Sequence, residues 1–220
     1  MYEITIPVIM ITGIGVSTNK MLIQLAIKES LYNDCFKHKC ITYNSLGVIY
    51  DMDVLKYDVS KPFNDIVYSI NTYLKQIEIN DSMSEIECLV INVGGGMIPL
   101  NRINTNDFGT LYRAYLFATS IDYMVICTNS LASEESIMNE IKKINAFGCK
   151  NIAVVVSKYS YDSTSLNRRG QVCTYTEDKG VIDAKVDKLK EILPDNITVM
   201  SFYDAIKGVL YRNIKYKLTK

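Results

Sequence analysis

The chain has 220 residues, of which 48% are hydrophobic, and its 24 basic side chains balance 24 acidic ones. A net charge of zero argues against a duplex nucleic-acid binder, which normally needs a basic face to displace counterions. The single histidine, His38, excludes metal sites built from several histidines. The six cysteines lack the close spacing of a zinc or redox motif, so we expect free thiols and no metal site.

Short, continuous apolar runs predict strands that are covered on both faces, as in parallel sheets. In chain order these strands are predicted at 8–11, 40–43, 89–91, 124–126, 152–156 and 197–202. Segments with helical periodicity alternate with them, at 20–32, 64–79, 110–120, 134–147, 183–193 and 203–211. The alternation predicts a doubly wound α/β fold, with a mainly parallel sheet flanked by helices. We expect one domain over 1–220, with a polar lid or hairpin insertion near 159–180.

No apolar run approaches the ~20 residues needed to cross a membrane. The N-terminus also lacks the basic start of a signal peptide. We therefore expect a cytoplasmic protein with no membrane partner and no nucleic-acid partner.

A glycine-rich segment joins the first predicted strand to the first predicted helix. Backbone amides in such a turn, a helix N-terminus and a lysine together receive a polyphosphate, as in P-loop NTPases. The segment predicts a P-loop NTPase-like site for ATP or GTP. Its candidate nucleotide-binding residues are Gly13, Gly15, Ser17, Thr18, Asn19 and Lys20.

Counted back from Lys20, this loop departs from the standard pattern G-x-x-x-x-G-K-[ST] at three positions, the first of which has Ile14 in place of the first glycine. Asn19 stands where the second glycine belongs, and Met21 replaces the hydroxyl residue that normally binds Mg²⁺. Gly13 lies seven residues before Lys20, a spacing similar to the longer loop of dethiobiotin-synthetase-like P-loop proteins. The alternative interpretation is a tight strand-to-helix turn in which Lys20 is simply solvated.

A second glycine-rich turn, Gly94-Gly95-Gly96, follows the predicted strand 89–91. In P-loop proteins this loop senses the terminal phosphate, so we add Asn92 and Gly94–Gly96 to the candidate site. The alternative interpretation of this segment is a wide turn at the sheet edge. Asn92 stands where an acidic magnesium ligand would be expected, and a neutral amide is a poorer ligand for this cation. Binding without efficient hydrolysis is therefore favoured, and the use of Mg²⁺ stays open. Ser17 or Thr18 is available to replace the hydroxyl ligand, and Asp51 or Asp53 is available to replace the carboxylate.

Several ordered motifs resemble a family of peptide-maturation-system proteins, which accompany radical-chemistry enzymes in bacterial clusters for ribosomally made, modified peptides. The resemblance extends over roughly residues 5 to 160. The matching motifs are Ile6-Pro7-Val8, the loop ending in Lys20, Gln24-Leu25-Ala26, Gly95-Gly96-Met97-Ile98-Pro99-Leu100-Asn101, Thr105-Asn106-Asp107-Phe108-Gly109 and Asp122-Tyr123. The resemblance implies a P-loop-type nucleotide-binding region and an accessory role in peptide maturation. Its implied partners are a precursor peptide or a peptide-modifying enzyme.

Two other functions compete with this one. The first is a degenerate fold kept as a peptide-binding or scaffolding subunit with no nucleotide. The second, a dehydrogenase-type Rossmann domain, is weaker because the first loop lacks the third glycine and no acidic ribose anchor follows the second strand. The residues leave open whether the protein is an NTPase and whether it forms a homodimer.

Overall fold

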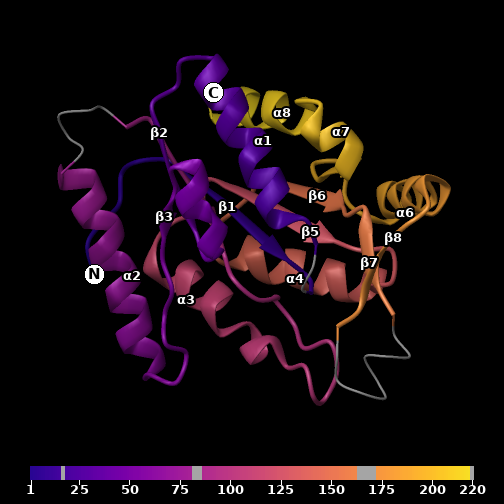
Figure 1. Cartoon of the computed structure of the whole chain (residues 1–220), viewed down its shortest axis with the longest axis horizontal. Coiled ribbons are helices and arrows are strands. Elements are labelled where there is room, and N and C mark those ends of the chain that lie inside the picture. Colours follow the sequence, from indigo (N-terminus) through magenta and orange to yellow (C-terminus); the bar gives the residue numbers. More distant parts are fainter. Residues whose placement is uncertain (16–17, 81–85, 163–171, 219–220) are drawn as a thin grey trace.

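The computed structural model describes residues 1–15, 18–80, 86–162 and 172–218. Its main feature is a seven-stranded parallel sheet in the order β3-β2-β4-β1-β5-β6-β9 (Figure 1). The strands are β1 (Val8–Gly13), β2 (His38–Thr42), β3 (Asp53–Val54), β4 (Cys88–Asn92), β5 (Tyr123–Thr128), β6 (Ile152–Val156) and β9 (Thr198–Ser201). The predicted parallel sheet is therefore confirmed. The sequence pattern missed β3 because its two residues form no apolar run.

Helices cover both faces of this sheet (Figure 1). One face carries α2 (Phe63–Asn80), α3 (Thr110–Ala118), α4 (Glu134–Ala146) and α6 (Lys179–Ile192), and the other carries α1 (Lys20–Asn33), α7 (Phe202–Ile206) and α8 (Val209–Leu218). Along β1, Val8 and Met10 pack into the first layer, while Ile9 and Ile11 pack into the second. This alternation explains why the strand reads as a continuous apolar run.

Two local predictions need correction. The predicted helix 203–211 is two helices, α7 and α8, because Gly208 between them has a left-handed φ of 85°. Helix α6 begins at Lys179 rather than 183, since the Asp178 side chain caps it by accepting a hydrogen bond from the Gly180 amide.

The polar segment near 159–180 contains a short antiparallel pair, β7 (Tyr159–Tyr161) with β8 (Thr174–Thr176). The Glu177 amide donates to the Lys158 carbonyl at 2.8 Å, which continues this pairing by one residue on each strand. We call this pair the β7–β8 hairpin.

Among the described residues, no helix combines the length and apolar character that a membrane crossing requires.

Candidate functional site

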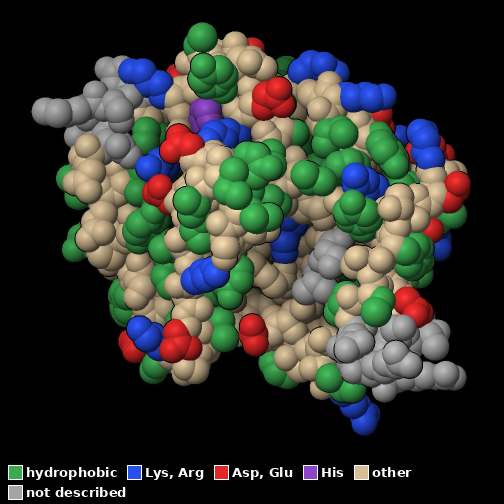
Figure 2. Space-filling model, in the orientation of Figure 1, with side chains coloured by type: hydrophobic (Ala, Val, Ile, Leu, Met, Phe, Trp, Pro, Cys, Tyr) green, Lys and Arg blue, Asp and Glu red, His purple; other side chains and the backbone are tan. Residues whose placement is uncertain are grey.

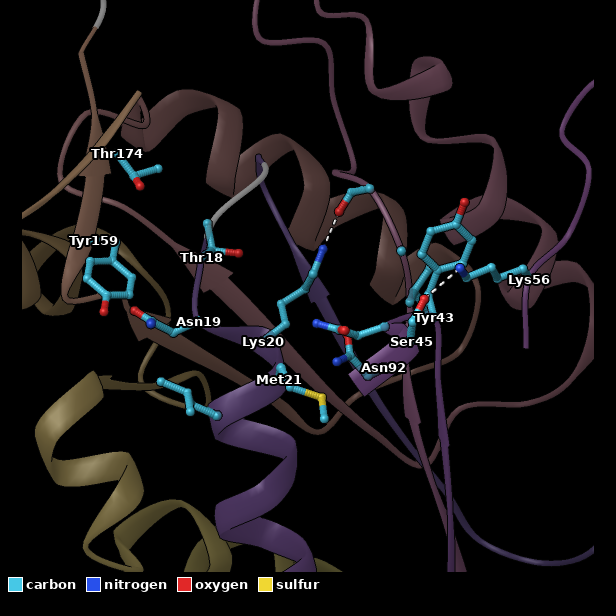
Figure 3. A pocket seen from close by; sticks show the side chains of 15 residues that line it. Thr18, Asn19, Lys20, Met21, Tyr43, Ser45, Lys56, Asn92, Tyr159 and Thr174 are labelled. Atoms are coloured by element: carbon cyan, nitrogen blue, oxygen red, sulfur yellow. Dashed lines mark hydrogen bonds between the residues drawn. The ribbon is translucent and has the colours of Figure 1, made fainter. Parts of the chain in front are cut away.

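A cleft of about 660 Å³ opens at the carboxyl ends of β2 and β4, beside the loop that follows β1. Figure 2 shows this face hollowed near its middle, with blue (Lys or Arg) side-chain atoms inside the hollow. The cleft lies where ligands bind in doubly wound sheets, and its volume suits a small organic molecule. Its walls come from five places: the start of α1, the segment after β2, the segment after β3, the turn after β4 and the β7–β8 hairpin (Figure 3).

The charged side chains that line the cleft are both basic. Lys20 comes from the first turn of α1 and Lys56 from the segment after β3, where its Nζ donates to the Ser45 hydroxyl at 2.7 Å. The described lining residues include no carboxylate. A chain of zero net charge thus concentrates positive charge at one opening, next to the N-terminus of a helix, which itself favours anions.

Lys20 points between the two glycine-rich turns (Figure 3). Its Nζ donates a hydrogen bond to the carbonyl oxygen of Gly95. Burial lowers the pKa of Lys20 to about 8, an effect that the nearby Cys127 thiol opposes. Burial disfavours the charged form of this lysine, so an anion bound beside it would stabilise the ammonium and raise its pKa.

The two glycine turns pack directly against each other. The Met97 amide donates to the Gly13 carbonyl at 2.7 Å, so the segment after β4 runs along the loop after β1. A Cβ atom on Gly96 would lie 3.0 Å from the backbone of Gly15 and 2.7 Å from the side-chain amide of Asn106. Only glycine permits this approach. The structure therefore brings Gly13, Gly15, Lys20 and the turn Gly94–Gly96 close together, with Lys20, Gly94 and Gly95 lining the cleft and Gly13, Gly15 and Gly96 lying behind it.

Asn19 has a left-handed backbone, with φ 59° and ψ 16°. Among residues with a side chain, asparagine tolerates this conformation best, so it replaces the usual glycine without a broken turn. Its side chain accepts hydrogen bonds from Ser157 and from the Lys158 amide.

The two hydroxyl candidates for magnesium have different outcomes. Thr18 lines the cleft, but its hydroxyl is buried and has no hydrogen-bond partner among the described residues. A Cβ atom added to Gly13 would lie 2.4 Å from this hydroxyl oxygen. Ser17 lies outside the described residues.

The donor set does not fit a magnesium ion held by protein carboxylates. Met21 and Asn92 both line the cleft, and neither side chain carries a hydroxyl or a carboxylate. Asp53 instead accepts from the Tyr73 hydroxyl at 2.7 Å and pairs with Lys39, and neither it nor Asp51 lines the cleft. No cluster of three or more His, Cys, Asp or Glu side chains suited to a metal occurs in the described part of the chain. Hard cations prefer carboxylate oxygens, and the described lining of this cleft contains none.

The cleft residues that the sequence reasoning missed include Tyr43, Lys56, Tyr159 and Thr174. Tyr43 directly follows β2, and the rule that ligands lie beyond strand carboxyl ends would have found it. Its ring lies against Gly94, where a Cβ would be 2.3 Å from the ring. Lys56 and the two hairpin residues carry no such signal, because their neighbouring strands have only two or three residues.

Comparison with solved structures finds the same fold at low sequence identity. A DUF1611 family protein from Anabaena variabilis aligns with a TM-score of 0.58 and 9% identity over 98% of this chain, which spans 58% of that protein's length. HypB from Helicobacter pylori, solved in complex with nickel, aligns with a TM-score of 0.50 and 9% identity, covering 96% of this chain and 87% of HypB. A putative plasmid partition protein from Borrelia burgdorferi bound to AMPPNP aligns with a TM-score of 0.47 and 14% identity, over 97% and 98% of the two chains.

No protein-family model matches the sequence, and no curated protein matches it either. The structural similarity, together with the parallel sheet and its two helical layers, confirms the doubly wound α/β fold that the sequence predicts.

Proposed function

We propose that this protein binds the polyphosphate chain of ATP or GTP in the cleft around Lys20. The observation that carries the proposal is the charge of the cleft: two lysines and a helix N-terminus face it, and its described lining has no carboxylate. Lys20 would contact the β- and γ-phosphates, and amides of the loop Gly13–Asn19 would bind the phosphate oxygens. The turn Gly94–Gly96, in which the Gly95 carbonyl accepts a hydrogen bond from the Lys20 ammonium, would approach the terminal phosphate.

The same cleft argues for binding with little hydrolysis. Phosphoryl transfer depends on neutralising charge on the phosphates, for which P-loop enzymes use a magnesium ion held by a hydroxyl and an acidic residue. Met21 and Asn92 occupy those positions here. We therefore propose a nucleotide-binding protein rather than an efficient NTPase.

The direct test is isothermal titration of the protein with ATP, GTP, their non-hydrolysable analogues and tripolyphosphate, each with and without Mg²⁺. Lys20→Ala should weaken binding by at least about tenfold, and Lys56→Ala by a smaller factor, as expected from losing one charge-assisted hydrogen bond each. Lys61→Ala is the matched control, because Lys61 is an exposed lysine outside the cleft and should leave binding unchanged. Thermal unfolding of each variant verifies that the fold is retained.

The competing function is a scaffolding or peptide-binding subunit that takes no nucleotide. Substitution of both usual magnesium positions favours it. Absence of detectable binding by the wild-type protein to any of these ligands, or unchanged binding by Lys20→Ala, would reject the nucleotide site and favour the scaffold.

We further propose that the protein acts in the cytoplasm, as an accessory factor in maturation of a ribosomally made peptide. This role rests on the ordered motifs that resemble peptide-maturation-system proteins, among them Gly95–Asn101 and Thr105–Gly109. Affinity capture of the tagged chain from its native host should recover a precursor peptide or a peptide-modifying enzyme. Size-exclusion chromatography with light scattering, with and without ATP, determines whether a homodimer forms.

A further inference from the structure

The side chain of Asn19 connects the loop after β1 to a distant part of the chain. Its Oδ1 accepts two hydrogen bonds, one from the Ser157 hydroxyl and one from the Lys158 amide at 3.1 Å. Both donors lie 138 or more residues away, at the end of β6. The left-handed backbone at Asn19 would suit glycine equally well. The asparagine side chain therefore adds something that the turn itself does not need.

Ser157 passes this connection on to the β7–β8 hairpin. The residue is buried, and its amide is fixed to β5 by a 2.7 Å hydrogen bond to the Thr128 carbonyl. The same hydroxyl that donates to Asn19 accepts from the amide of Tyr159, the first residue of β7, at 3.0 Å. The three residues form a continuous hydrogen-bonded chain from the phosphate-binding loop to the hairpin.

The hairpin contributes to the cleft itself. Tyr159 and Thr174 line it opposite Tyr43, with Lys20 between them (Figure 3). The Lys158 ammonium lies 5.0 Å from the centre of the Tyr159 ring and 5.2 Å from that of Phe202, which holds the hairpin base against α7.

We propose that Asn19 is a positioning residue that fixes the β7–β8 hairpin against the phosphate-binding loop, so that an anion bound by the loop also orders the hairpin wall. The residue acts through Ser157 on Tyr159 and does not itself need to touch the ligand with its side chain. The coupling to an anion rests on the proposed function, whereas the positioning of the hairpin in the free protein does not.

Hydrogen–deuterium exchange in the free protein tests the positioning. Asn19→Gly keeps the left-handed backbone and removes the side chain, and Ser157→Ala removes the intermediate hydroxyl. Both variants should accelerate exchange of the Tyr159, Asp162 and Glu177 amides by about tenfold, the size expected for a lost hydrogen bond between buried groups. In the wild type these amides donate to the Ser157 hydroxyl, the Cys173 carbonyl and the Lys158 carbonyl, respectively. Asn19→Asp keeps an acceptor oxygen and should exchange close to the wild-type rate.

Asp51→Gly is the matched control, because Asp51 is also a left-handed residue but lies outside the cleft. Wild-type exchange of the hairpin in Asn19→Gly would overturn the proposal. Equal acceleration in Asn19→Asp or in Asp51→Gly would overturn it too, since the effect would then not come from the hydrogen bonds of Asn19.

Tripolyphosphate, which has no base or sugar, tests the coupling. In the wild type it should slow hairpin exchange, and in Ser157→Ala it should bind without slowing it. If it binds and leaves wild-type hairpin exchange unchanged, the coupling is wrong. If it does not bind at all, the proposed function fails, and the exchange rates of the free variants still decide whether Asn19 positions the hairpin.

Discussion

The ammonium of Lys20 donates a hydrogen bond to the main-chain carbonyl of Gly95, 75 residues along the chain. This contact joins the two glycine-rich turns through one charged group. The first turn of α1 supplies the cation, and the turn after β4 supplies its acceptor. An incoming phosphate would compete with Gly95 for the same ammonium, so binding and the position of the second turn are expected to change together.

The depressed pKa of Lys20 predicts a specific pH dependence. With a pKa of about 8 in the free protein, the ammonium is lost as the pH rises through 8, whereas an arginine stays charged. The affinity of wild-type protein for tripolyphosphate should therefore fall by about tenfold per pH unit above pH 8. Isothermal titration between pH 6.5 and pH 9.5 measures it.

Lys20→Arg is the reference for that titration, because it reports the ionisation of the ligand alone. The ratio of wild-type to Lys20→Arg affinity should be constant below about pH 7 and fall above pH 8. A ratio that does not vary with pH would contradict the role of Lys20.

The close contact between Gly96 and Gly15 predicts the effect of a single added methyl group. Gly96→Ala forces the two turns apart, since the new Cβ would meet backbone at 3.0 Å, and should lower the free energy of unfolding by about 1–3 kcal/mol. It should also abolish ATP binding. Chemical denaturation and titration calorimetry measure the two effects.

Gly148→Ala separates stability from binding. Gly148 has a left-handed φ of 94° and open space around its Cβ position, so alanine there costs about 1–2 kcal/mol through the backbone alone. We expect comparable destabilisation with normal ATP affinity. Loss of binding in both variants would mean that stability, and not the approach of the two turns, controls the site.

Restoring the usual magnesium positions should make binding depend on that cation. In the double variant Met21→Thr with Asn92→Asp, ATP affinity should be about tenfold higher with Mg²⁺ than with a chelator, because a hydroxyl and a carboxylate then face the phosphates. In the wild type the two affinities should differ by less than about threefold. A wild-type protein with strong magnesium dependence would show that the cleft obtains its cation ligands elsewhere.

Glu134 predicts an acid-sensitive contribution to stability. It accepts from Lys185 at 2.8 Å and pairs with Lys188 at 2.9 Å, joining α4 to α6, and these contacts lower the pKa of its carboxyl to about 2. A carboxyl with a depressed folded-state pKa stabilises the protein above its unfolded value, near 4.5, and loses that contribution as the pH falls towards 2.

Glu134→Gln should therefore lower the free energy of unfolding at pH 7 by about 2 kcal/mol, the range for charge-assisted hydrogen bonds. The difference from wild type should shrink between pH 4.5 and pH 2, as measured by urea denaturation across that range. Glu135→Gln changes the next residue of the same helical turn, which is exposed, and should have little effect. A pH-independent difference would contradict the assignment to the ion pairs.

The sequence by itself determined the layered α/β fold and the location of the first glycine loop. Continuous apolar runs such as 152–156 are typical of strands that are covered on both faces, and helical periodicity between them predicts the alternation. Residue types also indicated a lysine at a helix start and the missing magnesium ligands at Met21 and Asn92. These features are local, so a pattern along the chain contains them.

Only the tertiary structure decided which distant groups share the cleft. Lys56 and Tyr159 reach it from segments next to strands too short to give a pattern, and Asn19 bonds to Ser157 because parallel strands bring their carboxyl ends to one edge. From sequence alone, Asn19 was a candidate nucleotide-binding residue that departs from a glycine motif. In the fold it adopts the backbone conformation of that glycine, and its side-chain oxygen reaches donors that no spacing along the chain identifies.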